Sequence, residues 1–372
     1  MKLFHLADVH LDRPFVGMSH EAARQRRRQV RDTFERCLKL ADDHAVDLIT
    51  IGGDLWEEEH VLPDTRRWVA DRLGRLNARV LMIGGNHDAF ISGQSHARTD
   101  WPPNVSRFLS SNPQEQRFEQ LSIWGASWTS ERFSLAFLDT FRVPDDGRVH
   151  FLLVHGTSGA AAYLDEEGRY GPFESRAIEK AGFALCLAGH IHAAQRAGKV
   201  VYPGSPEPLR WSETHDHCVA LVTVAGGPLT VELIPTNTHS YVDVTVDCGD
   251  AESSAAIEDA LRAACADIAN SAPRTYLTAY LVGEVSPECE VDADALAARH
   301  PEFAGVRVIN NTRFAYDFEA LAQRPTALGR FVTDLRARIE AAAGEDERGD
   351  LELALLAGVR AMDGQKDVLD VG

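Results

Sequence analysis

Five short motifs of metal-binding residue types occur within the first 192 residues of the chain. In order, they are Asp8-x-His10, Gly53-Asp54, Gly85-Asn86-His87-Asp88, His155-Gly156 and Gly189-His190-x-His192. Their carboxylate, imidazole and amide groups include no thiolate, which favours Mn²⁺ and similar cations over a structural zinc ion. Two such cations can generate a hydroxide nucleophile and hold the attacking and leaving oxygens of an in-line displacement at phosphorus. The motifs therefore predict a two-metal phosphoesterase.

The combination of motifs is more specific than any one of them. Asp-x-His and Gly-Asp are common pairs, and a single histidine such as His155 more often has a structural role. Gly-Asn-His-Asp is a much rarer string, and all five motifs follow apolar runs. A chance origin of the full set is therefore disfavoured.

Short apolar or β-branched runs lie next to the motifs and predict buried strands that end in loops. The carboxyl ends of strands in an α/β sheet gather at one edge, so ligands distant in sequence can converge there. Glycines beside the ligands permit sharp backbone turns. The predicted strands cover residues 2–7, 47–51, 79–83, 150–154 and 183–188.

The segments around the motifs resemble those of the calcineurin-like metallophosphoesterases. The similarity covers roughly the first 210 residues, in FHLADVHLDRPF, IGGDLW, GGNHD, LLVHG, LAGHIH and VYPGSPE. Leu11-Asp12-x-Pro14-Phe15 and Tyr202-Pro203-Gly204-Ser205 are similar to the DNA-repair nuclease branch, the SbcD/YhaO-like exonuclease subunits. The resemblance implies an α/β fold, arranged as a four-layer αββα sandwich, with two Mn²⁺ ions. It also implies hydrolysis of phosphodiesters at DNA ends or in single strands.

The resemblance assigns roles to individual residues. His87 would face the scissile phosphate and protonate the departing sugar oxygen, while Asp88 would fix the tautomer of His87 through the other ring nitrogen. One metal ion would be bound by Asp8, His10, Asp54 and His192, and the other by Asp54, Asn86, His155 and His190, with Asp54 as the bridge.

Glu57 departs from the family pattern. Some archaeal and eukaryotic relatives have a second catalytic histidine three residues after the bridging aspartate, where this chain has Glu57. The sequence therefore does not support a role in opening duplex ends that depends on that histidine. The acidic run at residues 57–59 could reach the outer shell of a metal site or repel misplaced DNA. Such runs after a strand are usually solvated, however, and its role is left open.

The net charge of −18 is unusual for a protein that contacts DNA, because lysine and arginine provide most of the attraction to phosphates. Residues 241–372 account for −13 of this charge, so the part that carries the motifs is nearly balanced. A predicted helix over residues 19–44 places Arg24, Arg27, Arg28 and Arg31 on one face. That face could follow a DNA backbone, and a solvated helix surface is the alternative.

Three domains are predicted. A catalytic domain covers residues 1–240, a smaller α+β capping domain residues 241–322, and C-terminal helices residues 323–372. Hydrophobic periodicity in the capping domain predicts strands and helices in alternation. The strands are expected at residues 241–247, 275–284 and 306–316, and the helices at 252–268 and 292–300.

The C-terminal helices are candidates for partner binding. A helix over residues 326–343 has an apolar stripe, and a polar break at 344–349 separates it from a helix over 351–362. In the family, such helices engage an SMC-type coiled-coil ATPase, so the resemblance implies an SbcC- or YhaN-like partner beside DNA. Intramolecular packing is the alternative, and a homodimer is a further expectation. The stripe consists of Leu328, Phe331, Val332, Leu335 and Ile339.

Two other function classes compete with a DNA nuclease. A small-molecule or protein phosphatase, or a cyclic-nucleotide phosphodiesterase, would use the same metals but would usually lack the capping domain and the basic helix. A metal-binding assembly module is disfavoured because His87 and every ligand are present. Scattered cysteines and the lack of an apolar leader or membrane-spanning run lead us to expect a cytoplasmic protein.

Overall fold

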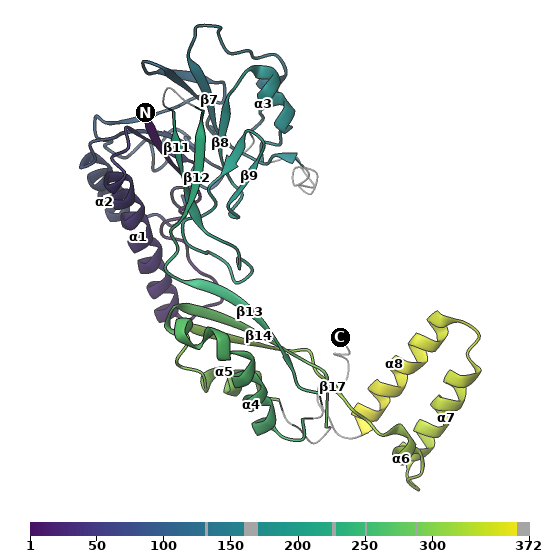
Figure 1. Ribbon diagram of the computed structural model, residues 1–372. Coiled ribbons are helices and arrows are strands. Elements are labelled where there is room, and N and C mark those ends of the chain that lie inside the picture. The colour runs from purple at the N-terminus through teal and green to yellow at the C-terminus, as the bar shows by residue number, and fades with distance from the viewer. Residues whose placement is uncertain are drawn as a thin grey trace. The chain divides into compact units, whose positions relative to one another are not determined.

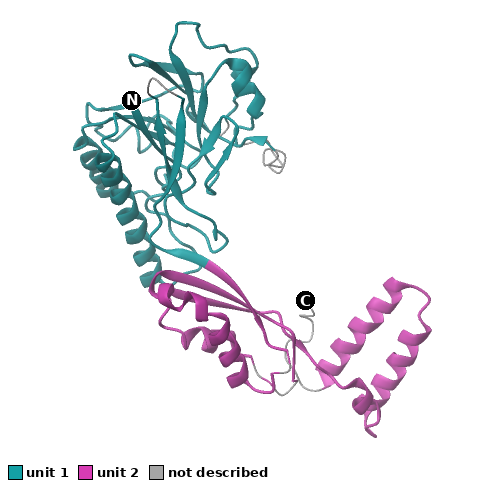
Figure 2. Ribbon diagram, in the orientation of Figure 1, with its two compact units in different colours: residues 1–241 teal, residues 242–372 magenta. Residues whose placement is uncertain are grey.

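The computed structural model divides the chain into two compact units, residues 1–241 and 242–372 (Figure 2). This division falls close to the predicted start of the capping domain, and the further boundary at residue 322 stays a prediction. The two units are described separately below. The structure describes residues 1–130, 133–159, 170–224, 228–249, 251–286, 289 and 291–362.

Unit 1 contains two six-stranded sheets (Figure 1). The first has the order β12-β11-β1-β2-β3-β4, in which β1 to β4 are parallel, and β11 pairs antiparallel with both β1 and the edge strand β12. Its strands are β1 (Lys2–Leu6), β2 (Leu48–Gly52), β3 (Arg79–Ile83), β4 (Val105–Arg107), β11 (Cys218–Thr223) and β12 (Thr230–Pro235).

The second sheet has the order β5-β6-β7-β8-β10-β9, with antiparallel strands at both edges. Its strands are β5 (Gln114–Arg117), β6 (Leu121–Gly125), β7 (Val149–His155), β8 (Leu185–Gly189), β9 (Gln195–Ala197) and β10 (Val200–Tyr202). The five predicted strands thus correspond to β1, β2, β3, β7 and β8, with ends that differ by up to two residues.

Helices cover the outer faces of both sheets. Helices α1 (His20–Asp43) and α2 (Pro63–Gly74) pack on the first sheet, and α3 (Ser175–Ala181) with the 3₁₀ helix η1 (Ala136–Asp139) packs on the second. A third apolar cluster fills the space between the sheets, where Leu3 of β1 meets Phe151 of β7. The predicted four-layer αββα sandwich is therefore confirmed.

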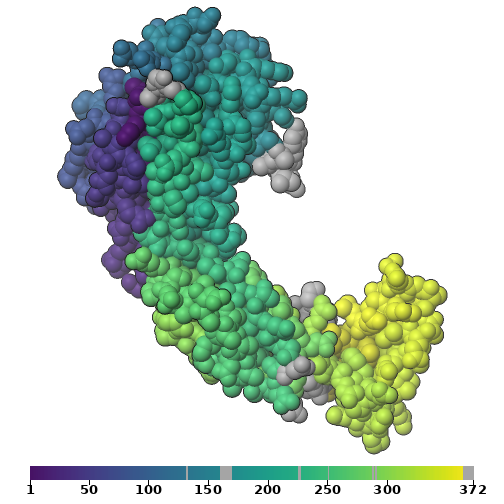
Figure 3. Space-filling model, in the orientation of Figure 1, coloured from purple at the N-terminus to yellow at the C-terminus, as the bar shows by residue number. Residues whose placement is uncertain are grey.

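Helix α1 is fixed at its start and along one side. The Ser19 hydroxyl accepts a hydrogen bond from the backbone N–H of Ala22, as an N-cap does. Arg26 of α1 is fully buried, although it lies among exposed polar residues in the sequence. It forms an ion pair with Glu207 at 3.5 Å and donates to the carbonyl oxygen of Pro208. These contacts attach α1 to the segment after β10. In the space-filling view, purple N-terminal residues of unit 1 lie beside green residues of the same unit (Figure 3).

Unit 2 begins with a three-stranded sheet in the order β13-β14-β16, with helices α4 and α5 contributing to its core. The predicted helix over residues 252–268 ends earlier, and its last residues form a 3₁₀ helix that contains Pro273. Likewise, the strand expected at 306–316 is divided in two. The elements are β13 (Ser240–Asp247), α4 (Ser254–Ala264), η3 (Ala266–Arg274), β14 (Thr275–Val282), β15 (Glu284–Val285), α5 (Ala293–Ala298), β16 (Gly305–Asn310) and β17 (Arg313–Phe314).

Three helices follow: α6 (Phe318–Ala322), α7 (Ala327–Ala341) and α8 (Glu345–Met362). The polar break expected at residues 344–349 is wrong, because α8 starts at Glu345 with three acidic residues that suit a helix N-terminus.

The apolar stripe of α7 is the core of this helical group. Val332 is fully buried and Leu335 nearly so, and both pack with Leu355 and Val359 of α8. The hypothesis that this stripe binds an ATPase is therefore wrong, since its side chains are used within the chain. None of the described helices is both long enough and apolar enough to cross a membrane.

Candidate active site

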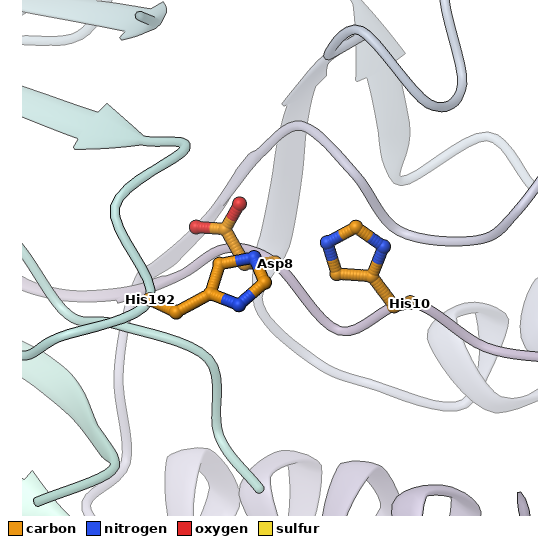
Figure 4. Close-up of side chains that lie close together, drawn as sticks. All are labelled: Asp8, His10 and His192. Atoms are coloured by element: carbon orange, nitrogen blue, oxygen red, sulfur yellow. The ribbon is translucent and has the colours of Figure 1, made fainter. Parts of the chain in front are cut away.

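The structure brings the seven predicted ligands together where the two sheets meet. Asp8 and His10 follow β1, Asp54 follows β2 and Asn86 follows β3. From the second sheet, His155 ends β7, and His190 and His192 follow β8. The side chains of Asp8, His10 and His192 lie close to one another in Figure 4. Their ligand atoms lie within 4.8 Å of one another.

Asp54 lies at the centre of the group. Its Oδ2 is 3.5 Å from His10 Nε2 and 3.3 Å from His155 Nε2, so one carboxylate oxygen is shared by two imidazoles. Asn86 Oδ1 lies 3.0 Å from His155 Nε2 and 3.1 Å from His190 Nδ1. These contacts place Asp54 between His10 on one side and the group of His155, Asn86 and His190 on the other, which suits a bridging carboxylate.

The backbone at these positions is strained. Asp8, His10, Asp54 and His190 all have positive φ angles, of 54°, 51°, 52° and 99°. Such angles are uncommon outside glycine and cluster at functional sites, where the surrounding structure holds them. Gly85 is needed for a different reason, because a Cβ there would lie 2.2 Å from Asp54 Oδ1. The positive φ angles and the glycine at position 85 thus allow ligand side chains and backbone to lie close together.

Hydrogen bonds fix three of the ligand histidines in one tautomer. His10 donates from Nδ1 to Glu57 Oε1 at 2.9 Å, and His192 donates from Nδ1 to Glu213 Oε1 at 2.7 Å. His155 donates from Nδ1 to the carbonyl oxygen of Gly52 at 2.8 Å. Each neutral ring therefore presents an unprotonated Nε2 to the interior of the site, as a metal-ligating histidine does.

The chemistry of these groups fits divalent cations. His10 Nε2 is buried and has no hydrogen-bond partner among the described residues. Several acceptor atoms also face one another at 3.0 to 3.5 Å, an arrangement that is repulsive without a proton or a cation between them. Carboxylate, imidazole and amide oxygen ligands suit Mn²⁺ and related ions. The seven residues can therefore hold two such ions.

Charges within the site shift the pKa values of its members strongly. Burial raises the pKa of Asp8 above its usual range. Burial also opposes ionisation of Asp54, but the charge of His155 outweighs it and holds the pKa of Asp54 far below its usual range. Burial alone would lower the pKa of His155. The Asp54 carboxylate outweighs burial, and the pKa of His155 rises to about 9. In the protein without metal, a proton on His155 thus compensates a charge that a cation would otherwise neutralise.

His87 is held by Glu57 and not by Asp88. Its Nδ1 donates to Glu57 Oε2 at 2.7 Å, and its backbone N–H donates to Asp54 Oδ1 at 2.9 Å. The hydrogen bond that His87 donates to Glu57 raises the pKa of His87 against the effect of burial. The prediction that Asp88 fixes the tautomer of His87 is therefore wrong.

Asp88 stabilises the backbone that carries the ligands. Its Oδ1 accepts from the backbone N–H groups of Asp54 and Gly85, at 2.9 and 2.7 Å. Its Oδ2 accepts from the N–H of Leu55 at 2.8 Å and from His96 Nε2 at 3.0 Å. Because Asp88 is fully buried, all four contacts are shielded from water. The carboxylate therefore joins the loops after β2 and β3 and has no direct part in proton transfer.

Sequence reasoning missed the groups that orient the ligands. It leaves the role of Glu57 open, and it does not single out Glu213, His96 or the carbonyl of Gly52. The one available signal is that Glu57, three residues after Asp54, departs from the pattern of the family that the sequence resembles. Glu213 carries no such signal, because it lies 21 residues from its partner His192.

The predicted basic face of α1 is only partly free. Arg31 donates to Thr65 Oγ1 at 3.0 Å and stacks on Trp68, with its guanidinium carbon 4.7 Å from the ring centre. Arg27 donates to the carbonyl oxygen of Pro14. Arg24 and Arg28 are exposed. Contact with DNA through this helix stays a prediction, and it rests mainly on these two exposed arginines.

A family model described as calcineurin-like phosphoesterase matches residues 1–194. Since this is more than half of the chain, the protein belongs to the calcineurin-like phosphoesterase family. The name of this family describes phosphoester hydrolysis, and the ligand cluster supplies residues that can bind the metal ions for such chemistry.

Several known proteins are similar to the chain. The uncharacterized metallophosphoesterase YhaO of Bacillus subtilis is 29% identical over 273 residues, which cover 69% of this chain and 65% of YhaO. The DNA double-strand break repair protein Mre11 of Methanopyrus kandleri is 24% identical, over 58% of this chain and 51% of that protein. Mre11 of Sulfolobus acidocaldarius is 23% identical, over 66% of this chain and 67% of that protein. The chain therefore spans about half to two thirds of these relatives.

Among solved structures, TT1561 of Thermus thermophilus aligns with a TM-score of 0.36 and 12% identity. The alignment covers 62% of this chain and 98% of TT1561.

Proposed function

We propose that the protein is a Mn²⁺-dependent phosphodiesterase that cleaves DNA as a repair nuclease. The observation that carries this proposal is a cavity of about 720 Å³ beside His87. Arg13 and Arg210 line it together with Phe15 and Trp211, and Glu57, Glu58 and Glu59 line it as well, so its walls offer aromatic surface beside groups of both charges. Arginines suit phosphates and aromatic rings suit nucleobases, whereas a simple phosphate ester would need little of this surface.

The ligand residues would hold two cations, which supply charge neutralisation at the phosphoryl group and activation of water. His87 Nε2 would deliver its proton to the departing sugar oxygen. Glu57 fixes the His87 ring through Nδ1 and stabilises its protonated form. Arg13 donates to the same carboxylate at 2.8 Å, which keeps Glu57 in place.

Similarity to two Mre11 proteins supports the assignment to DNA repair. We further propose an SMC-type ATPase as partner, together with homodimer formation. Because the stripe of α7 is buried, such a partner would have to bind another surface of unit 2.

An assay with purified protein and Mn²⁺ on end-labelled single- and double-stranded DNA, beside mono- and bis-p-nitrophenyl phosphate, tests the proposal. We expect cleavage of DNA and of the bis-ester. Preferential turnover of the mono-ester, with no cleavage of DNA, would instead indicate a phosphatase of the same family. A His87→Gln variant is purified in parallel. Loss of activity in this variant would show that the measured activity does not come from a contaminating nuclease.

A further inference from the structure

A second cavity, of about 620 Å³, lies beside α2 and is called the α2 cavity below. Four arginines line it, two from the body of α2 and two from the same surface outside the helix: Arg66, Arg67, Arg75 and Arg98. Its acidic lining residues are Asp71 and Asp100. The α2 cavity thus has more arginines than acidic residues, although the net charge of the chain is −18. The charge of the α2 cavity favours an anion.

Two of the arginines have no strong ion pair of their own. Arg98 is exposed, and its side chain makes no hydrogen bond or ion pair with any described residue. Arg66 reaches only the carbonyl oxygen of Ser95, at 3.4 Å, and its Nε is buried without a partner among the described residues. Arg67 and Arg75 pair with neighbouring aspartates at exposed positions, where such pairs contribute little and can exchange. The guanidinium groups are therefore available to a ligand.

The α2 cavity and the active-site cavity share a wall. Gln94 lines the cavity beside His87, and Arg98 lines the α2 cavity. The turn between them is closed by a hydrogen bond from the backbone N–H of Arg98 to the carbonyl of Gln94. Within this turn, Ser95 accepts from Arg66 through its carbonyl and donates from its backbone N–H to Glu58 Oε1 at 2.9 Å. Since Glu58 lines the active-site cavity, one short segment separates the two sites.

Resting on the proposed function, we propose that the α2 cavity binds a backbone phosphate of the DNA strand whose scissile phosphate lies at His87. An anion site next to a phosphodiesterase centre suits a ligand with regularly spaced phosphates. Arginine recognises phosphate through paired hydrogen bonds and charge. The site would make the enzyme favour a strand that extends past the scissile bond over a short ester.

Arg98→Glu is the informative variant, because Arg98 is exposed and its loss leaves no buried group unpaired. Arg98→Lys keeps the charge, and Arg176→Glu is the matched control, since Arg176 is 74% exposed on α3 of the opposite sheet. KM and kcat are measured on single-stranded oligonucleotides of graded length, on a dinucleotide and on bis-p-nitrophenyl phosphate. Binding of an uncleaved oligonucleotide is measured separately in chelator.

For Arg98→Glu we expect KM on long oligonucleotides to rise about tenfold with kcat unchanged, and the log-log salt slope of binding to fall by about 0.7. The dinucleotide and the bis-ester should be unaffected, and Arg98→Lys should resemble the wild-type protein. If Arg98→Glu matches Arg176→Glu on long strands, or weakens the dinucleotide equally, the strand contact is refuted.

Binding of inorganic phosphate distinguishes a free-anion site. If Arg98→Glu weakens phosphate binding but leaves KM on long strands unchanged, the cavity binds free anions and the strand contact is overturned. If the wild-type protein cleaves no DNA while Arg98→Glu still weakens oligonucleotide binding, the proposed function fails and the phosphate site stands.

Discussion

Replacement of Glu57 by glutamine tests how the active site controls its histidines. The Glu57 carboxylate accepts from two rings at once, from His10 Nδ1 at 2.9 Å and from His87 Nδ1 at 2.7 Å. A glutamine side chain has only one acceptor oxygen, and its amide nitrogen can only donate. One ring must therefore turn an unprotonated Nδ1 towards the amide and carry its proton on Nε2. On His10, that proton would occupy the atom predicted to bind metal.

The size of the effect follows from the lost contact. A hydrogen bond to a charged group contributes about 1.5 to 3 kcal/mol, and about 1.4 kcal/mol corresponds to a factor of ten. We therefore expect Glu57→Gln to lower kcat about 10- to 100-fold, which is also the range typical of residues that orient metal ligands. Metal affinity should fall as well, so the defect should be larger at limiting Mn²⁺ than at saturating Mn²⁺.

The pH profile separates this orienting role from simple structural damage. The Glu57 hydrogen bond raises the pKa of His87, so the protonated ring persists to higher pH than it would without that bond. In Glu57→Gln the pKa of His87 should fall, and the alkaline limb of kcat should move to lower pH. Both proteins are compared at saturating Mn²⁺, so the metal charges are the same and the difference reports Glu57.

Glu59→Gln is the control, because Glu59 lines the same cavity and is exposed. It removes the same charge without touching a ligand, and its kinetics should stay within about twofold of the wild-type values. Unchanged kcat and an unchanged alkaline limb in metal-saturated Glu57→Gln would refute the argument. Equal losses in both variants would show that charge near the cavity matters and that orientation of the rings does not.

Three further predictions follow from the same structure. His87→Gln should retain its metals and lose about 10² to 10⁴ in kcat, whereas Asp54→Asn should lose both metals, as metal analysis beside kinetics will show. Phe331→Glu with Leu335→Glu should lower the melting temperature, because it places charges in the packed core of α7 and α8; melting as stable as the wild type would contradict that packing. Burial lowers the pKa of His5 to about 4, so metal-free wild-type protein should lose up to about 3 kcal/mol more stability than His5→Asn as pH falls from about 6.5 to about 4.

The ligands could be predicted from the sequence because their type and place agree. Each belongs to a motif next to a strand, and parallel strands bring their carboxyl ends to one edge. Helix α1 was predictable for a similar reason, since Ser19 and the arginine spacing mark its start and its faces. Spacing could not show which face is covered, and it gave no sign that Arg26 is buried in a pair with Glu207.

The same limit explains the error at the C-terminus. An apolar stripe such as that of α7 fits a partner and a neighbouring helix equally well, because periodicity records which side chains avoid water and not what covers them. Only the structure shows that α8 covers the stripe, and Gly358 of α8 is part of that contact. A Cβ at that position would lie 2.1 Å from the Phe331 ring, so the close approach of the two helices depends on a glycine that the pattern left unmarked.

The two carboxylates near His87 show why adjacency in sequence is a poor guide to contact at a strained turn. Asp88 is the next residue in the chain, yet its side chain points to the backbone N–H groups of Asp54, Leu55 and Gly85. Glu57 is 30 residues away and takes the ring nitrogen instead. A carboxylate with four acceptor sites can satisfy several buried backbone donors, and a buried loop end leaves such donors unpaired without it. The fold therefore requires Asp88 for the loops, and the orientation of His87 depends on Glu57.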